Sequence, residues 1–191
     1  IYLTGAFHED GLADSADGLG GGWDKERILT IMQDSRLGTY GAVAIFMMLL
    51  VKFQTLNAMH GILIPAALVC AHALSRLSAV WLMHTLSYVK FNGKAKPLAT
   101  EIKGIDFFVA HVFGLLPFIR VLAFMMVNHY TPRLIAELLL ITLTPMLLSW
   151  LWWWHKIRKW LGGYTGDTLG AMQQVTELTF YLGVLAWSLR L

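Results

Sequence analysis

Long apolar runs alternate with short polar connections along this chain. Five runs of 19–23 residues carry few charged side chains: residues 41–59, 62–83, 105–127, 134–154 and 169–189. Each is long enough to cross a hydrocarbon core of roughly 30 Å as an α-helix. Residues 1–17 predict the end of a sixth helix, whose apolar beginning would precede the sequence. The pattern therefore predicts an all-α, polytopic membrane helix bundle with about six transmembrane helices.

Composition supports the same fold class. Hydrophobic residues make up 57% of the 191 residues and charged residues only 14%, whereas a soluble domain has about 25% charged residues. Neither an internal repeat nor a linker divides the chain, so residues 1–191 are expected to form a single integral-membrane domain. Because the sequence begins with Ile beside an acidic motif, we expect it to lack the N-terminal helices of the full-length protein.

Basic residues are concentrated on one side of the predicted bundle. The connections 18–40, 90–104 and 155–168 fall on the same side and carry ten of the fifteen Lys and Arg residues, against Arg133 alone in the opposite connections. Positively charged loops stay in the cytoplasm, so this side is expected to be cytoplasmic. The neighbouring tryptophans predict an aromatic belt at that interface: Trp150, Trp152, Trp153 and Trp154.

Acidic residues cluster near the start of the chain. Asp10, Asp14 and Asp17 are spaced i, i+4, i+7, so they would share one face of a helix. Like charges on one face repel, and each costs roughly 2.5–3.5 kcal/mol at the centre of a membrane helix. Mg²⁺ would compensate, since it binds carboxylate oxygens and shares them with substrate phosphates. The alternative is a polar loop whose aspartates cap turns and face water.

A second acidic position lies within residues 18–40. Apolar and charged residues alternate there in a way that predicts a short amphipathic helix at the membrane surface, with Asp24 as its N-cap. Such a helix would return Asp34 and Arg36 to the first aspartates, just before the next apolar run. We therefore predict a metal site formed by four carboxylates: Asp10, Asp14, Asp17 and Asp34.

Several polar residues inside the apolar runs allow two interpretations each. Arg76 would either pair with a carboxylate or bind phosphate. Glu177 would either contact the residues that form the site, without touching the substrate, or have a structural role. Lys52 is expected to extend its amine to the membrane surface. Asp167, which follows Thr165 and Gly166 at the start of the last run, would cap that helix or help to hold an anion there.

Carboxylates and Mg²⁺ at a membrane edge suit displacement at a phosphoanhydride. The metal neutralises charge on the leaving group, while a spare carboxylate accepts the proton of the nucleophile. The spacing leaves the substrates open. Alternatives are a membrane Mg-diphosphate transferase of another class, either a CDP-alcohol phosphotransferase or a prenyltransferase, and a cation transporter. A transporter would hold its acids near the bilayer midplane, whereas these crowd one edge.

Three blocks of sequence closely resemble the cobalamin synthase family: residues 5–18 (GAFHEDGLADSADG), 31–41 (IMQDSRLGTYG) and 162–171 (GGYTGDTLGA). The resemblance extends from residue 1 to the last apolar run. It implies an adenosylcobinamide-GDP ribazoletransferase, a late enzyme of vitamin B12 biosynthesis. In the implied Mg²⁺-dependent reaction, α-ribazole or its 5′-phosphate attacks adenosylcobinamide-GDP, GMP leaves, and adenosylcobalamin or its 5′-phosphate forms.

The first block also looks like a variant of the CDP-alcohol phosphotransferase signature, with Asp14 where that signature has Arg. By this likeness Asp10, Asp14 and Asp17 are metal ligands, and Asp34 is a ligand or the base. Catalytic roles are expected for Asp17, Asp34 and Arg36, whose planar guanidinium suits bidentate phosphate binding. The expected phosphate contacts are Arg36, Arg76, Thr165 and Asp167.

The resemblance also implies the setting of the enzyme. Mg²⁺ is the expected cofactor, and the expected partners are adenosylcobinamide-GDP, α-ribazole or its 5′-phosphate, and the lipid bilayer, with no nucleic acid. A homo-oligomer and complexes with other corrinoid-pathway enzymes both stay open. Residues 1–191 would be a multi-pass catalytic domain of the bacterial cytoplasmic (inner) membrane, with an active site resembling that of CDP-alcohol phosphotransferases facing the cytoplasm.

Overall fold

The computed structural model describes residues 2–89, 102 and 104–190, and this part of the chain is helical almost throughout. Within it, an isolated bridge between Tyr88 and Tyr164 is the only β-type pairing. The all-α prediction is confirmed. The helices are α1 (Phe7–Gly21), α2 (Lys25–Met32), α3 (Thr39–Ala58), α4 (Ile64–Thr85), α5 (Gly104–Val127), α6 (Pro132–Leu161) and α7 (Gly166–Ser188), with short 3-10 turns η1 (Tyr2–Thr4) and η2 (Gly61–Leu63).

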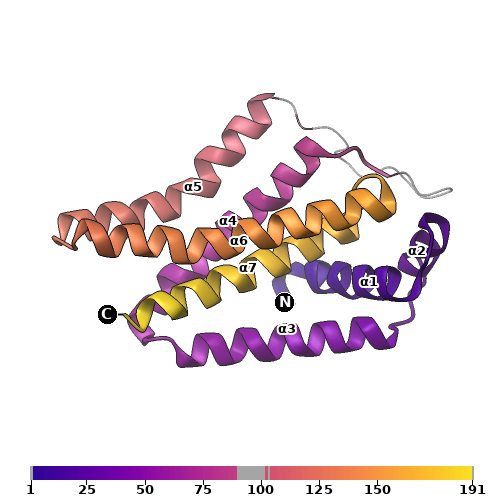
Figure 1. Cartoon of the computed structure of the whole chain (residues 1–191), viewed down its shortest axis with the longest axis horizontal. Helices are drawn as coiled ribbons and strands as arrows, with labels where there is room; N and C mark the ends of the chain where they lie inside the picture. The colour runs from indigo at the N-terminus through magenta and orange to yellow at the C-terminus, as the bar shows by residue number, and fades with distance from the viewer. Residues whose placement is uncertain (1, 90–101, 103, 191) are drawn as a thin grey trace.

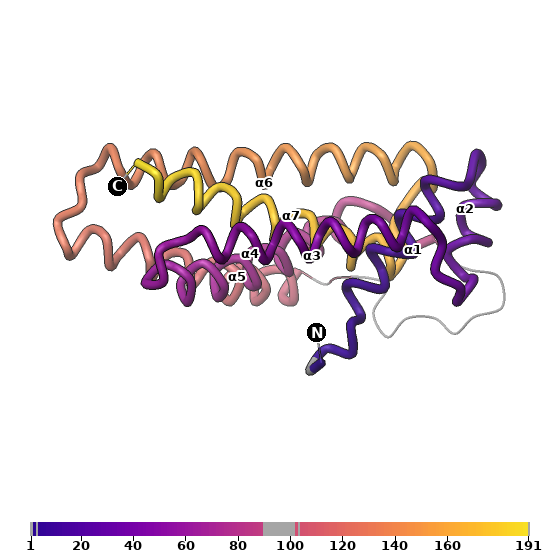
Figure 2. Tube along the Cα trace, turned by 90° about the horizontal axis from the view of Figure 1, so that it is seen from below, coloured from indigo at the N-terminus to yellow at the C-terminus, as the bar shows by residue number. Residues whose placement is uncertain are grey.

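Helix α7 lies in the middle of the bundle, where it contacts α1, α3, α4 and α6 (Figure 1). Helix α5 packs mainly on α4 instead, and Figure 2 shows α6 running along one side of the molecule. The short helix α2, the start of α3 and the end of α6 lie together at one end of the bundle. The turn between α5 and α6 and the C-terminus lie at the other end.

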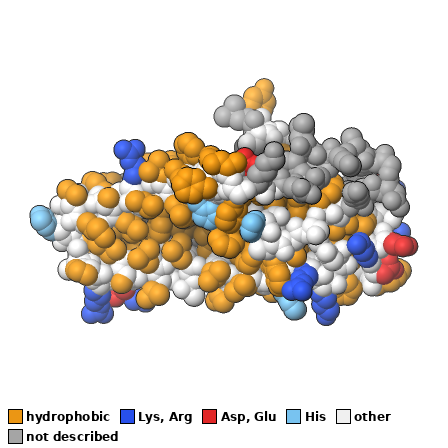
Figure 3. Space-filling view, turned by 90° about the horizontal axis from the view of Figure 1, so that it is seen from above, with side chains coloured by type: hydrophobic (Ala, Val, Ile, Leu, Met, Phe, Trp, Pro, Cys, Tyr) orange, Lys and Arg blue, Asp and Glu red, His pale blue; other side chains and the backbone are white. Residues whose placement is uncertain are grey.

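Four helical segments of the described chain are long and apolar enough to cross a membrane: Thr39–Ala58, Gly61–Thr85, Gly104–Val127 and Pro132–Leu161. Their outward surfaces are largely hydrophobic, and Figure 3 shows apolar side chains over much of one face with Lys and Arg near its margins. The fifth predicted run forms α7, whose Gln173, Gln174 and Glu177 are buried inside the bundle. The protein is therefore a helical membrane protein with four candidate spans in its described part.

Local sequence signals set the ends of the helices. Asp24 caps α2, because its carboxylate accepts a hydrogen bond of 2.8 Å from the backbone N–H of Arg27, and this confirms the predicted amphipathic helix and its N-cap. Helix α6 ends at Gly162, which adopts a left-handed conformation with φ of 75° that glycine tolerates best. Thr165 and Thr168 then form a capping box that begins α7.

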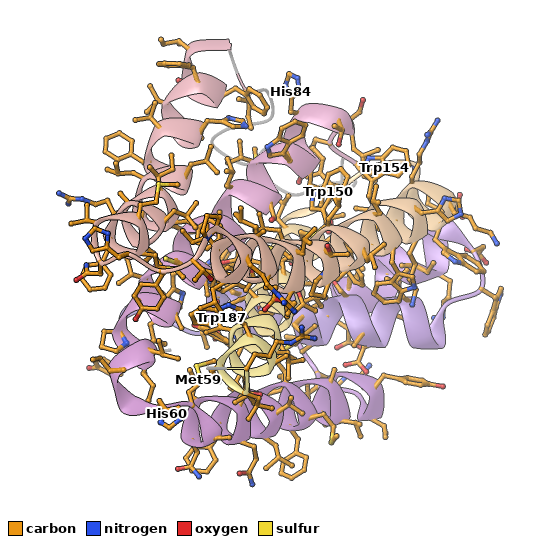
Figure 4. The ribbon with its side chains drawn as sticks, turned by 60° about the vertical axis from the view of Figure 1, so that its left-hand side comes forward. Met59, His60, His84, Trp150, Trp154 and Trp187 are labelled. Atoms are coloured by element: carbon orange, nitrogen blue, oxygen red, sulfur yellow. The ribbon has the colours of Figure 1, made fainter. Side chains whose placement is uncertain are left out.

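The tryptophans near the end of α6, predicted to form an interfacial belt, also make specific contacts within the bundle. Trp150 and Trp154 stack on one side of the helix (Figure 4). The indole N–H of Trp150 donates to the carbonyl of Ser78 at 3.0 Å, and that of Trp154 donates to the Thr85 hydroxyl at 3.1 Å. These bonds attach α6 to α4. Buried Trp153 similarly ties α6 to the start of α7, whereas Trp152 is exposed.

Candidate active site

Helix α1 brings the first and third sequence blocks together by direct contact with α7. A Cβ atom placed on Gly11 would lie 2.8 Å from the carbonyl oxygen of Asp167, and one on Gly170 would lie 3.2 Å from the Cα of His8. Only glycine allows two helix backbones to approach this closely. Helix α1, which carries the aspartates, is consequently held against the first turn of α7.

The second block is attached to α1 through Asp17. Its carboxylate accepts hydrogen bonds from the backbone N–H groups of Gly38 at 2.8 Å and Gly41 at 2.9 Å. These groups lie at the N-terminus of α3, where free N–H groups and the positive helix end favour a carboxylate. Asp17 is buried, so a buried carboxylate from α1 provides the N-terminal cap of α3.

Asp34 and Arg36 form an exposed, bidentate pair in the loop before α3. The Arg36 Nε lies 3.0 Å from Asp34 Oδ1, and Nη2 lies 2.6 Å from Oδ2. Hydrogen bonds from the Arg36 side chain and backbone lower the pKa of Asp34 from 3.8 to about 2. A carboxylate with so low a pKa is a weak proton acceptor near neutral pH. Asp34 is therefore better suited to binding a cation than to acting as a base.

The four predicted metal ligands do not form one cluster. In the described part of the chain, no three His, Cys, Asp or Glu side chains are arranged to hold a metal ion together. Asp10 and Asp14 lie four residues apart on α1, with Asp10 exposed and Asp14 half-buried. Mg²⁺ is usually held by one or two carboxylates, with water and substrate phosphates as its other ligands. The pair of carboxylates on α1 fits such a site.

The turn between α6 and α7 is fixed by backbone pairing. The N–H of Val89 donates to the carbonyl of Tyr164 at 2.8 Å, and the N–H of Tyr164 donates to that of Ser87 at 3.0 Å. Burial and the nearby charge of Asp167 raise the pKa of Tyr88. The residues that follow α4 therefore pair with the turn that leads into α7. The pairing of Tyr88 with Tyr164 was not predicted from the sequence.

Two predicted phosphate contacts have other partners in the structure. Thr165 is fully buried, and its hydroxyl accepts a hydrogen bond from the backbone N–H of Thr168 in the capping box. The Arg76 guanidinium donates to the carbonyl oxygen of His72 at 2.9 Å, within α4. Asp167, in contrast, is half-buried in the first turn of α7, next to Gly11. Asp167 therefore lies where the first turn of α7 contacts α1.

A buried polar network lies deeper in the bundle and was missed from the sequence. The amine of Lys52 lies 2.8 Å from Glu177 Oε1 and 2.6 Å from Gln174 Oε1, and Gln174 in turn donates to Glu9 at 3.2 Å. The other oxygen of Glu177 lies 3.3 Å from His72 Nδ1. The Lys52 side chain is only 13% exposed. The prediction that Lys52 extends to the membrane surface is wrong, because a buried carboxylate holds its charge.

Comparison with known proteins identifies the family. The family model described as cobalamin-5-phosphate synthase matches residues 1–185. The chain belongs to this family. All three sequence blocks that meet at α1 lie within the matched residues, and the resemblance noted in the sequence is thus confirmed.

Curated relatives of this family carry one enzyme name. An adenosylcobinamide-GDP ribazoletransferase of Ralstonia pickettii (strain 12J) is 46% identical over 189 residues, which are 98% of this chain and 69% of that protein. The enzyme of the same name from Leptospira biflexa is 36% identical over 207 residues, covering 98% of this chain and 71% of that protein. No solved structure matches the chain.

The close packing of α1 on α7 leads to a first prediction. Gly11→Ala is expected to destabilise the protein by about 1–3 kcal/mol, because the new methyl group meets backbone atoms of Asp167 that cannot move aside. Unfolding in mixed micelles measures this change. Gly166→Ala is the matched control, since a Cβ at Gly166 meets nothing within 4 Å. Equal stability of the two variants would show that the helices are not in close contact.

Proposed function

We propose that this chain is an adenosylcobinamide-GDP ribazoletransferase, which joins α-ribazole or its 5′-phosphate to adenosylcobinamide-GDP and releases GMP. The names of its relatives and the family match over residues 1–185 support this activity. The observation on which the site depends is the contact of Gly11 with Asp167. This contact holds the helix that carries Asp10 and Asp14 against the start of α7, where we expect the diphosphate to bind.

Asp10 and Asp14 are the residues that would hold Mg²⁺ in this proposal. They are two oxygen donors on one helix face, which leaves the remaining coordination positions to water and to the diphosphate of the nucleotide substrate. When bound, the metal neutralises charge that develops on the departing GMP. Asp17 acts differently from the original prediction: it holds the start of α3 against α1 and so positions the loop that carries Asp34.

Arg36 is the proposed phosphate contact from that loop. Its side chain is 87% exposed, and its guanidinium is already oriented by two bonds to Asp34. An arginine held in this way presents its remaining N–H groups in a fixed plane, which suits phosphate oxygens. Asp34 would then act by orienting Arg36 and by adding negative charge near the metal.

We further propose that the site faces the cytoplasm of a bacterial inner membrane and resembles that of CDP-alcohol phosphotransferases. Lys156, Arg158 and Lys159 extend from the end of α6 on the side where α2 also lies, in keeping with positive loops that remain inside. The basic residues of the connection 90–104, Lys90, Lys94, Lys96 and Lys103, lie outside the described residues. Helix α7 and the helix whose end was predicted at residues 1–17 would bring the four candidate spans to the six predicted ones.

The experiment that tests the function supplies both substrates to membranes containing the complete protein. With adenosylcobinamide-GDP, α-ribazole and Mg²⁺, we expect GMP and the joined corrinoid in equal amounts. A chelator should stop both products, and excess Mg²⁺ should restore them. Product without any divalent cation would refute the metal site, and GMP release without the corrinoid product would refute the transfer. A parallel reaction with α-ribazole 5′-phosphate identifies the preferred acceptor.

A further inference from the structure

A groove of about 630 Å³ lies behind α1, away from the candidate active site. The residues of α1 that line it include Leu12, Ala16 and Leu19. At about 100° per residue, these positions are turned by roughly 120° or more from Asp10 and Asp14. The groove therefore uses the opposite face of α1 from the aspartates, and it is closed on its other sides by α3, α6 and α7.

Small side chains create this space and apolar ones line it. Ala16 of α1 and Ala44 of α3 leave room between the helices, and Val43 and Trp153 provide apolar walls. Val43 is 56% exposed on the outer surface of α3, so the groove is open toward the region occupied by lipid chains. An extended hydrocarbon chain matches these walls better than a polar ligand does.

A lysine lies at the rim of the groove. Lys156 lines it, and its amine lies 5.2 Å from the centre of the Trp152 ring. None of the ion pairs found among the described residues includes Lys156. The residue is 24 positions beyond Pro132 at the start of α6, or about 36 Å along the helix. This exceeds a hydrocarbon thickness of roughly 30 Å, so Lys156 reaches the level of lipid headgroups, just beyond the interfacial Trp152.

We propose that this groove binds an anionic phospholipid, with its phosphate at Lys156 and one acyl chain between α1, α3 and α6. The unpaired positive charge at the rim selects an anionic headgroup, and the apolar interior accepts the chain. A lipid bound there contacts Leu12, Ala16 and Leu19 of α1 and does not touch Asp10 or Asp14. The site is independent of the proposed phosphotransfer chemistry.

Native mass spectrometry of the delipidated full-length protein tests this site. The protein is titrated with phosphatidylglycerol or with phosphatidylcholine of the same acyl chains. One phosphatidylglycerol is expected to bind about fivefold more tightly than phosphatidylcholine, as suits one lysine near a membrane surface. Lys156→Gln should remove this preference. Lys159→Gln, which changes a lysine outside the groove, should leave it unchanged.

A second variant tests the acyl-chain position. Val43→Trp fills the groove from an exposed position on α3, so it should lower the retention of both lipids at least fivefold while the protein remains folded. Equal binding of the two lipids by the unaltered protein would overturn the proposal. An equal loss of preference in Lys159→Gln, or full retention of lipid in Val43→Trp, would overturn it as well, since binding would then be a general surface effect.

Discussion

Asp10→Asn and Asp14→Asn are each expected to lower the rate of GMP release by about a thousandfold, while the helices stay inserted in the membrane. Each change removes one of the two charged oxygen ligands that α1 supplies to the proposed metal site. Loss of one electrostatic contact to the reacting group has costs of this size in other enzymes. The rate is measured at saturating substrates over a range of Mg²⁺ concentrations. The concentration giving half the maximal rate should also rise.

Asp24→Asn is the matched control for these variants. Asp24 lies in the same acidic region, but it caps α2, and asparagine caps a helix about as well as aspartate. Its activity should stay close to that of the unaltered protein. Full activity of Asp14→Asn would rule out the metal site, and a similar loss in Asp24→Asn would point to a general effect of charge.

Asp17 should behave differently from both. Because its two oxygens hold the start of α3, Asp17→Ala is expected to lower stability as well as activity. The stability of Asp10→Asn, which changes an exposed side chain, should in contrast be unchanged.

Breaking the buried pair between Lys52 and Glu177 should have the largest effect on stability. Glu177→Gln leaves the amine of Lys52, only 13% exposed, without its carboxylate, and loss of one partner from a buried pair costs about 3–5 kcal/mol. The free energy of unfolding in mixed micelles measures this loss. The double variant Lys52→Met, Glu177→Gln should recover more than half of it, because the uncompensated charge is then removed.

The pair formed by Arg133 and Glu137 provides the comparison. It has a similar separation of 2.9 Å, but the Arg133 side chain is 87% exposed, and pairs of this kind contribute roughly 0–1 kcal/mol. Glu137→Gln should therefore cost much less than Glu177→Gln. Similar costs for the two variants would mean that water reaches Lys52 in the folded protein.

Hydrophobic length predicted the long helices well, because crossing a membrane requires a nearly continuous apolar run. The run 105–127 became α5 at Gly104–Val127. The predicted run 134–154 was shorter than the helix, because α6 continues to Leu161. The basic residues after position 154 end the apolar run without ending the helix. The all-α class and the family were also predictable. Both depend on patterns that are local in the sequence, namely apolar runs and short motifs.

The candidate site was only partly predictable, because spacing within one helix does not reveal what faces it. The pattern places Asp17 on the same side of α1 as Asp10 and Asp14, but it cannot show that α3 begins against Asp17 and uses its carboxylate. The partnership of Lys52 with Glu177 joins residues 125 positions apart, and a single sequence contains no signal for that pairing. Tertiary contacts of this kind decide which charged residues serve chemistry and which serve assembly.

The polar character of central α7 has a consequence for how the protein is made. With buried Gln173, Gln174 and Glu177, this helix gains less from entering lipid than the four apolar candidate spans do. It is also the last described helix to leave the ribosome. We therefore expect the translocon to integrate it only after α3 and its Lys52 are in place, so that α7 enters the membrane as the partner of a helix already there.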